Sequence, residues 1–170
     1  MKISFAKLLL KESQEFLQLA RYERSDKFLR VMYIKASIAF AWFGLEGVIN
    51  LISSDFLVLK NLPLHEKAFV EEKNIEFQEG EFKIMGKRYR STKNKLLYLL
   101  KSFGNYNMSQ KGKLWIKLNN LEEMRNALVH PKSSPSIKNF KEKNAEEGLK
   151  TVISIIKILY KKIYNKDIRL

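Results

Sequence analysis

Apolar residues recur along most of the chain at steps of three and four positions, the spacing that places them on one face of an α-helix. The clearest example begins near Asp26, where positions 31, 34, 38, 41, 45, 48 and 52 are all apolar. Pro63, the Gly104-Asn105 pair and Pro131 interrupt the pattern, and such residues are typical of helix boundaries. The pattern predicts helices over about 4–24, 26–53, 64–77, 91–103, 110–129 and 139–165.

The segment 79–89 breaks the helical period. It contains Gly80 and Gly86, and we expect it to form a loop or a small hairpin. The chain shows no internal repeat, no low-complexity segment and no domain linker. The pattern therefore predicts an all-α protein folded as a single domain, residues 1–170.

The helix predicted over 26–53 is apolar on nearly all of its faces. Such a helix is buried in a protein core, in an oligomer interface or in a membrane. A membrane is disfavoured, because Glu46 and Asn50 would lie in the hydrocarbon and the run falls short of a clean span of ~20 residues. A core helix that also faces a partner chain fits better.

The composition excludes several kinds of catalytic and metal-binding site. The chain has no cysteine, which excludes disulfides, cysteine-ligated zinc and thiol catalysis. His65 and His130 are its only histidines, so we expect no metal site and no other cofactor. Lys7 interrupts the apolar stretch at the N-terminus, where no small-residue cleavage site follows. This pattern does not favour a signal peptide, and we expect a cytoplasmic protein.

The formal net charge is +14, and the charges are segregated along the sequence. No acidic residue occurs between Glu81 and Glu122, a stretch with ten basic residues and interleaved aromatic ones, whereas the preceding stretch is acidic. One interpretation is a positive surface that binds phosphate. The other is a solvated lysine-rich surface whose aromatic residues pack in the core, and charge alone does not separate the two. The candidate RNA-binding residues are Lys87, Arg88, Arg90 and Lys132.

Arg125 stands where the pattern requires an apolar residue. It continues a stripe formed by Leu114, Leu118, Leu121 and Leu128. A buried guanidinium needs a partner or a water-filled cleft. Between residues 36 and 54 the only charged side chain is that of Glu46, which makes the two natural partners. An internal salt bridge kept for architecture alone would explain both residues equally well.

His130 follows Arg125 by five residues and precedes Pro131, which disfavours helical geometry at the histidine. His130 can therefore leave the helix and approach Arg125. Asn126 precedes His130 by four residues and lies on the same side of the helix as the histidine. The alternative is a histidine that only interacts with the dipole at a helix C-terminus. An arginine and a histidine at this spacing are by themselves a weak motif.

The chain resembles the HEPN superfamily of helical domains. The resemblance rests on Arg125-Asn126-Ala127-Leu128-Val129-His130-Pro131, which matches the family's Arg-x(4–6)-His signature, on the apolar segment 39–50 with Glu46, and on the segment 63–67. It implies an up-and-down helical bundle with a four-helix core and extra helices. It also implies a homodimer, or paired domains, and metal-independent RNA cleavage at a composite site between protomers.

The resemblance also implies roles for four residues. His130 would act as general base or acid at the ribose 2′-OH or the leaving oxygen, and a histidine titrates near neutrality. Arg125 would stabilise charge on the transition state, Asn126 would orient the phosphate or a neighbouring side chain, and Glu46 would position Arg125. One histidine is too few for both proton transfers, and a two-fold dimer supplies the second.

One position departs from the family. A toxin branch carries a tyrosine two residues after the histidine, where a partner antitoxin attaches a nucleotide, and this chain has Lys132 there. Regulation through that tyrosine is therefore in doubt, although a toxin–antitoxin or defence context, with an antitoxin protein as partner, remains the expectation. The alternatives are a non-catalytic module that binds RNA or a partner protein, and a purely structural bundle.

Overall fold

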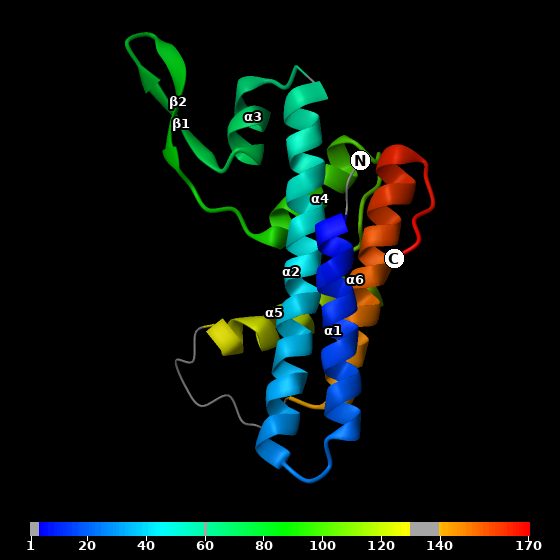
Figure 1. Cartoon of the computed structure of the whole chain (residues 1–170). Helices are drawn as coiled ribbons and strands as arrows, with labels where there is room; N and C mark the ends of the chain where they lie inside the picture. The colour runs from blue at the N-terminus through cyan, green and yellow to red at the C-terminus, as the bar shows by residue number, and fades with distance from the viewer. Residues whose placement is uncertain (1–3, 60, 130–139) are drawn as a thin grey trace.

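The computed structural model describes residues 4–59, 61–129 and 140–170, and six helices and one two-stranded sheet lie in these ranges. Helices α1 (Ser4–Tyr22), α2 (Lys27–Leu59) and α6 (Glu142–Tyr164) run alongside one another, and α5 (Lys113–Val129) lies across them (Figure 1). The fold is therefore a predominantly helical bundle, and the all-α prediction is confirmed in this broad form. The other elements are α3 (Leu64–Val70), β1 (Lys73–Gln78), β2 (Glu81–Lys87) and α4 (Thr92–Ser102).

Helix α2 begins where the sequence predicted. The Asp26 carboxylate accepts hydrogen bonds from the backbone N–H groups of Phe28 at 2.8 Å and Leu29 at 3.0 Å, so it caps the helix. The helix continues to Leu59 rather than ending near Ser53. Phe56 explains the extension, because its ring is buried and stacks on Phe103 with the centroids 3.7 Å apart.

The core is built around α2. Ile38, Leu45 and Ile52 on this helix are fully buried, and they belong to one cluster with side chains from α1, α4, α5 and α6. By length and composition alone α2 could cross a membrane, and it is the one helix of the described ranges with that property. However, 56% of its apolar window is buried inside the protein. Its apolar surface therefore serves mainly the protein core.

The third predicted helix was too long. Helix α3 ends at Val70, Glu72 has a positive φ of 55°, and the chain then enters β1. Strands β1 and β2 pair antiparallel around Glu79 and Gly80, whose φ values of 54° and 85° have the signs of a type I′ turn. The expected hairpin is thus confirmed, but it includes residues that were assigned to a helix.

The remaining boundaries differ from the predictions by a few residues. Ser91 caps α4, since its hydroxyl accepts a 3.2 Å hydrogen bond from the backbone N–H of Asn94. Helix α5 begins at Lys113 rather than near 110, and α6 begins at Glu142 rather than near 139.

Candidate functional site

Helix α5 carries two of the four predicted catalytic residues. The stripe that predicted its buried face is confirmed, because Leu118 and Leu121 are fully buried and Leu128 packs against the core. Arg125 continues this stripe and is partly buried, whereas its neighbour Asn126 is exposed. The helix therefore holds a guanidinium at the edge of an apolar surface.

The hydrogen bonding of this guanidinium is incomplete. Arg125 Nη1 donates to Asn126 Oδ1 at 3.1 Å, but Arg125 Nε is buried and has no hydrogen-bond partner among the residues that the structure describes. Buried donors are almost always satisfied, and an unsatisfied one costs roughly 1–3 kcal/mol. A cationic donor without an acceptor suits an oxyanion such as phosphate.

Glu46 does not pair with Arg125, so that expectation is corrected. Its Oε1 atom accepts hydrogen bonds from Trp42 Nε1 at 2.7 Å and Thr92 Oγ1 at 2.9 Å, and no ion pair joins it to Arg125 within the described ranges. Trp42 lies one helical turn before Glu46, and Thr92 begins α4. The carboxylate therefore ties α2 to the start of α4, with two neutral donors in place of the expected guanidinium.

The structure brings Glu46 together with a different predicted residue, Arg90. Both line a polar cavity of about 180 Å³ at the start of α4. Arg90 lies over the ring of Phe69 at 5.2 Å, and its Nε is buried with no hydrogen-bond partner in the described part of the chain. The cavity is lined by Glu46, Ile49, Asn50, Glu72, Tyr89, Arg90, Thr92 and Lys95.

The charges in this cavity are largely balanced. Lys95 Nζ forms an ion pair with Glu72 at 2.6 Å and donates to Asn50 Oδ1 at 3.1 Å. Glu46 and Arg90 add one charge of each sign. The cavity can therefore offer donors and acceptors together, which suits a polar ligand such as a nucleobase better than a bare phosphate.

The basic stretch between Glu81 and Glu122 is less positive than its sequence suggested. Lys93 bridges α4 and α5, because its Nζ lies 2.5 Å from Glu122 and donates to Asn119 at 3.0 Å. Trp115 is buried, and most of the other interleaved aromatic residues pack against the core. Within the described ranges, ion pairs engage four of the ten basic residues, namely Lys83, Lys93, Lys95 and Lys117.

Two predicted RNA-binding residues, Lys87 and Arg88, are exposed at the open end of the hairpin. Arg88 Nη1 donates weakly to Asn74 Oδ1, at 3.4 Å, and its backbone N–H donates to the Glu72 carbonyl at 2.7 Å. The adjacent Tyr89 is 78% exposed. This surface presents two cations beside an aromatic ring, a combination that fits single-stranded nucleic acid. The predicted residues His130 and Lys132 lie outside the described residues.

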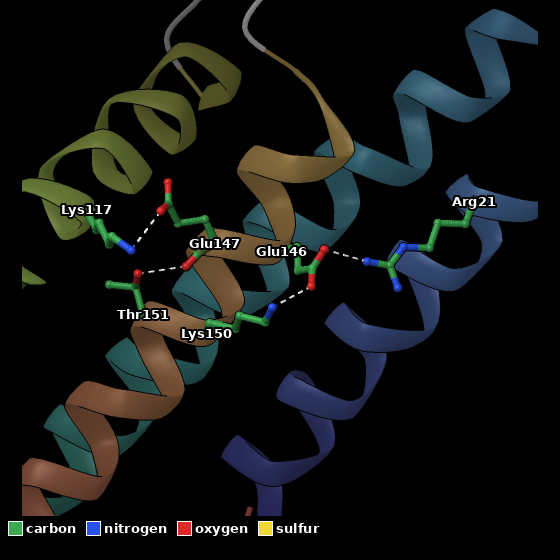
Figure 2. Close-up of polar contacts among 6 residues, drawn as sticks. All are labelled: Arg21, Lys117, Glu146, Glu147, Lys150 and Thr151. Atoms are coloured by element: carbon green, nitrogen blue, oxygen red, sulfur yellow. Dashed lines mark hydrogen bonds and ion pairs between the residues drawn. The ribbon is translucent and has the colours of Figure 1, made fainter.

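Surface ion pairs join α5 to α6 and α6 to α1. The Nζ atom of Lys117 on α5 lies 2.8 Å from the carboxylate of Glu147, and this contact lowers the pKa of the carboxyl group. The Thr151 hydroxyl donates a hydrogen bond to the backbone carbonyl of Glu147 (Figure 2). Figure 2 also shows Glu146 between Lys150 and Arg21 of α1, and these cations, Lys150 first, lower its pKa. A cavity of about 240 Å³ lies between α5 and α6, and no predicted site residue of the described ranges lines it.

Some polar partners were missed by the sequence predictions. Trp42 could have been found, because it lies four residues before Glu46 on the same helix. Thr92 could not, since it is 46 residues away along the chain.

The described residues contain no group of three or more histidine, aspartate or glutamate side chains that could hold a metal ion. Comparisons with known protein families, with characterised proteins and with solved structures give no match for this chain.

Proposed function

We propose that this protein is a metal-independent endoribonuclease of the HEPN type, with its site shared between two copies of the chain. The observation that carries the proposal is Arg125, a guanidinium on an apolar stripe whose Nε lacks a partner among the described residues. It is bonded to Asn126 and precedes His130 by five residues. The proposal includes a HEPN-like bundle, a cytoplasmic location and a role in defence or in a toxin–antitoxin pair.

The proposed reaction needs only proton transfer and charge stabilisation. One histidine removes the proton of a ribose 2′-OH, whose oxygen attacks the adjacent phosphorus, and the bond from phosphorus to the 5′-oxygen breaks. A second histidine, from the other copy, protonates the departing oxygen, which leaves a 2′,3′-cyclic phosphate and a 5′-hydroxyl. Arg125 stabilises the negative charge on the phosphoryl oxygens, and Asn126 holds its guanidinium in place.

Glu46 takes a different role from the one first expected. Because it binds Trp42 and Thr92, it positions the start of α4 rather than Arg125. Lys93, the next residue of α4, in turn contacts Asn119 and Glu122 of α5. Glu46 therefore acts on the proposed site through α4 and is a positioning residue.

The test is cleavage of a single-stranded RNA by the purified full chain in the presence of EDTA. We expect cyclic phosphate ends, and we expect His130→Ala and Arg125→Ala each to reduce the rate by at least about 10²-fold. His65→Ala is the matched control, because it removes the other histidine of the chain and should leave the rate unchanged. Robust cleavage by the His130→Ala variant would disprove the assignment.

A second candidate is an RNA-binding module without catalysis. It is favoured by the exposed Lys87, Arg88 and Tyr89, which lie at the hairpin rather than on α5. This candidate predicts RNA binding that weakens steeply with salt and is unchanged in His130→Ala. Lys87→Ala and Arg88→Ala would then lower the affinity while no cleavage is seen in any variant.

A further inference from the structure

The polar cavity at the start of α4 contains two charged groups that do not bond to each other. It lies where the segment after β2 returns from the hairpin to the bundle (Figure 1). Glu46 and Arg90 both line it, yet no ion pair joins them, and Arg90 Nε is buried without a hydrogen-bond partner in the described ranges. Lys95 and Glu72 neutralise each other at 2.6 Å. The unused bonding capacity of the cavity therefore belongs mainly to one carboxylate and one guanidinium.

The Glu46 carboxylate can accept two further hydrogen bonds. An ionised carboxylate has about four acceptor positions, two at each oxygen. Oε1 accepts from Trp42 Nε1 at 2.7 Å and from Thr92 Oγ1 at 2.9 Å, whereas Oε2 accepts no hydrogen bond from the described residues. A ligand with two adjacent N–H donors would therefore complete the hydrogen bonding of this side chain.

Arg90 has the opposite preference, because a guanidinium only donates. Its planar fork of N–H groups matches two adjacent acceptor atoms on one ligand. The guanidinium lies over the ring of Phe69, 5.2 Å from its centroid, and no ion pair in the described part of the chain engages it. The pair of side chains thus matches a ligand that has two donors on one edge and two acceptors beside them.

Guanine is the nucleobase with this arrangement of groups. Its N1–H and 2-amino donors are adjacent, and its O6 and N7 acceptors are the pair that arginine binds through both arms of its fork. Adenine and cytosine would instead place a ring-nitrogen acceptor against the carboxylate, and uracil has a single N–H on that edge. Tyr89 also lines the cavity and is 78% exposed, so its ring is available to stack on a base.

We propose that this cavity binds a guanine base. Glu46 Oε2 accepts from N1–H and the 2-amino group, Arg90 donates to O6 and N7, and Tyr89 stacks on the ring. The base comes either from a free guanine nucleotide or from an unpaired guanine of RNA. This site goes beyond the proposed function, because the binding of a base requires neither catalysis nor a second copy of the chain.

The first test is isothermal titration calorimetry of the full chain with guanosine 5′-monophosphate (GMP) and with the adenosine, cytidine and uridine monophosphates. All four carry the same phosphate, so the net charge of +14 attracts them equally and only the base differs. We expect GMP to bind at least about tenfold more tightly than the other three. Inosine monophosphate lacks the 2-amino group and 7-deaza-GMP lacks the N7 acceptor, so each should bind more weakly than GMP.

Two variants assign each edge of the base to a side chain. Glu46→Gln keeps an acceptor oxygen for Trp42 and Thr92 but places an amide donor at the position of Oε2, so it should lower GMP affinity at least about tenfold. The difference between GMP and inosine monophosphate should then disappear. Arg90→Lys removes the fork and should reduce the difference between GMP and 7-deaza-GMP. Arg24→Lys is the matched control, because Arg24 is exposed and does not line the cavity.

Nuclear magnetic resonance places the ligand in the cavity. The chain has two tryptophans, so its spectrum contains two indole N–H signals, which Trp42→Phe assigns. The Trp42 indole bonds to Glu46 Oε1, so its signal should shift when GMP binds. Trp115 does not line the cavity, and its signal is the internal reference.

An oligonucleotide separates the two sources of the base. The probe is a 2′-O-methyl pentanucleotide of uridines with one central guanosine, which has no free 2′-OH, and its control has a central adenosine. Tighter binding of the guanine probe than of GMP assigns the site to RNA, since Lys87 and Arg88 precede Tyr89 and are exposed toward flanking phosphates. Binding no tighter than that of GMP assigns it to a free guanine nucleotide.

Equal affinity for the four monophosphates would overturn the proposal, because a polycation attracts them all alike. Wild-type GMP affinity in Glu46→Gln, or an unshifted Trp42 signal in the GMP complex, would also contradict it. The comparison of nucleotides uses the unaltered chain, so it decides the matter even if a variant folds poorly. GMP contains no phosphodiester bond, so its binding is independent of cleavage. Cleavage of RNA without a preference for GMP would refute this site alone, and GMP binding without cleavage would refute only the nuclease.

Discussion

Helix α2 and the hairpin carry similar side chains in very different surroundings. Both present aliphatic and aromatic residues at the regular spacing of their secondary structure. In α2 these side chains are covered by α1, α5 and α6, so Leu45 is fully buried. In the hairpin, Phe82 is 65% exposed. Periodicity thus identifies the residues that share a face, whereas the number of neighbouring elements decides whether that face is covered.

The two regions meet at the polar cavity at the start of α4. Glu46 and Asn50 reach it from α2, Glu72 precedes the hairpin, and Tyr89 and Arg90 follow it. The contacts there are hydrogen bonds and ion pairs, with few apolar side chains among them. We therefore expect the bundle to unfold as one cooperative unit and the hairpin to open independently.

The strongest test of this difference uses the same substitution in both regions. Ile38→Ala, at a fully buried position of α2, should lower the free energy of unfolding by about 2–5 kcal/mol, because it leaves a cavity in the core. Ile84→Ala, at a partly exposed position of the hairpin, should lower it by less than about 1 kcal/mol. Urea denaturation at low protein concentration measures both. Equal losses would show that the hairpin belongs to the cooperative core.

A smaller effect is expected at the junction of the two regions. Glu46→Ala leaves Trp42 Nε1 and Thr92 Oγ1 without their acceptor, and such a loss costs about 1–3 kcal/mol. Glu46→Gln keeps an acceptor oxygen and should cost less. Hydrogen exchange should report faster opening of the first turn of α4 in Glu46→Ala, with no change in the hydrogen bonds between β1 and β2.

Thr92→Val is the control for this junction, because it removes one donor and preserves the side-chain shape. It should loosen α4 less than Glu46→Ala does, since the bond from Trp42 to Glu46 remains. If Glu46→Ala had the same stability and the same exchange rates as the wild-type chain, the carboxylate would contribute nothing to this boundary.

The sequence predicted the bundle well, because its helices have strong local signals. The start of α2 near Asp26, the apolar positions of that helix and the stripe of α5 all follow from signals within one element. The first strand was missed, since Ile75 and Phe77 extend an apolar helical pattern unless their alternation is matched to Phe82 and Ile84 across the turn. Strand pairing depends on contacts between elements, which single-chain periodicity does not contain.

The candidate site could be predicted only in part, for the same reason. Arg125 is recognisable because it interrupts the apolar pattern of its own helix. The partners of Glu46 depend on how α4 packs on α2, and Thr92 carries no signal of that contact in the sequence. The sequence predicts a pair between Glu46 and Arg125, because each is a single charged residue in an apolar segment. Tertiary packing instead gives Glu46 two neutral donors.

The smallest effect concerns an unsatisfied polar atom in the bundle. Tyr160 of α6 is buried, and its hydroxyl has no hydrogen-bond partner among the described residues. Burial, and then the negative charge of Asp55, raise the pKa of Tyr160 to about 12. Tyr160→Phe removes this hydroxyl and should change the free energy of unfolding by no more than about 0.5 kcal/mol at neutral pH. Tyr164→Phe should cost more, since it breaks a 3.1 Å hydrogen bond to Asp55.

Tyr160→Phe should also change how the free energy of unfolding depends on pH. An unfolded tyrosine loses its proton near pH ~10, whereas folded Tyr160 keeps its proton up to a pKa of about 12. The stabilisation from this difference is complete below pH ~10 and is lost as the pH rises toward 12, so Tyr160→Phe should make the alkaline decline shallower. Urea denaturation at pH 7 and at steps above pH 9 measures both effects. An unchanged slope would show that the pKa of Tyr160 is not raised, and a large loss at pH 7 would show that its hydroxyl has a hydrogen-bond partner in solution.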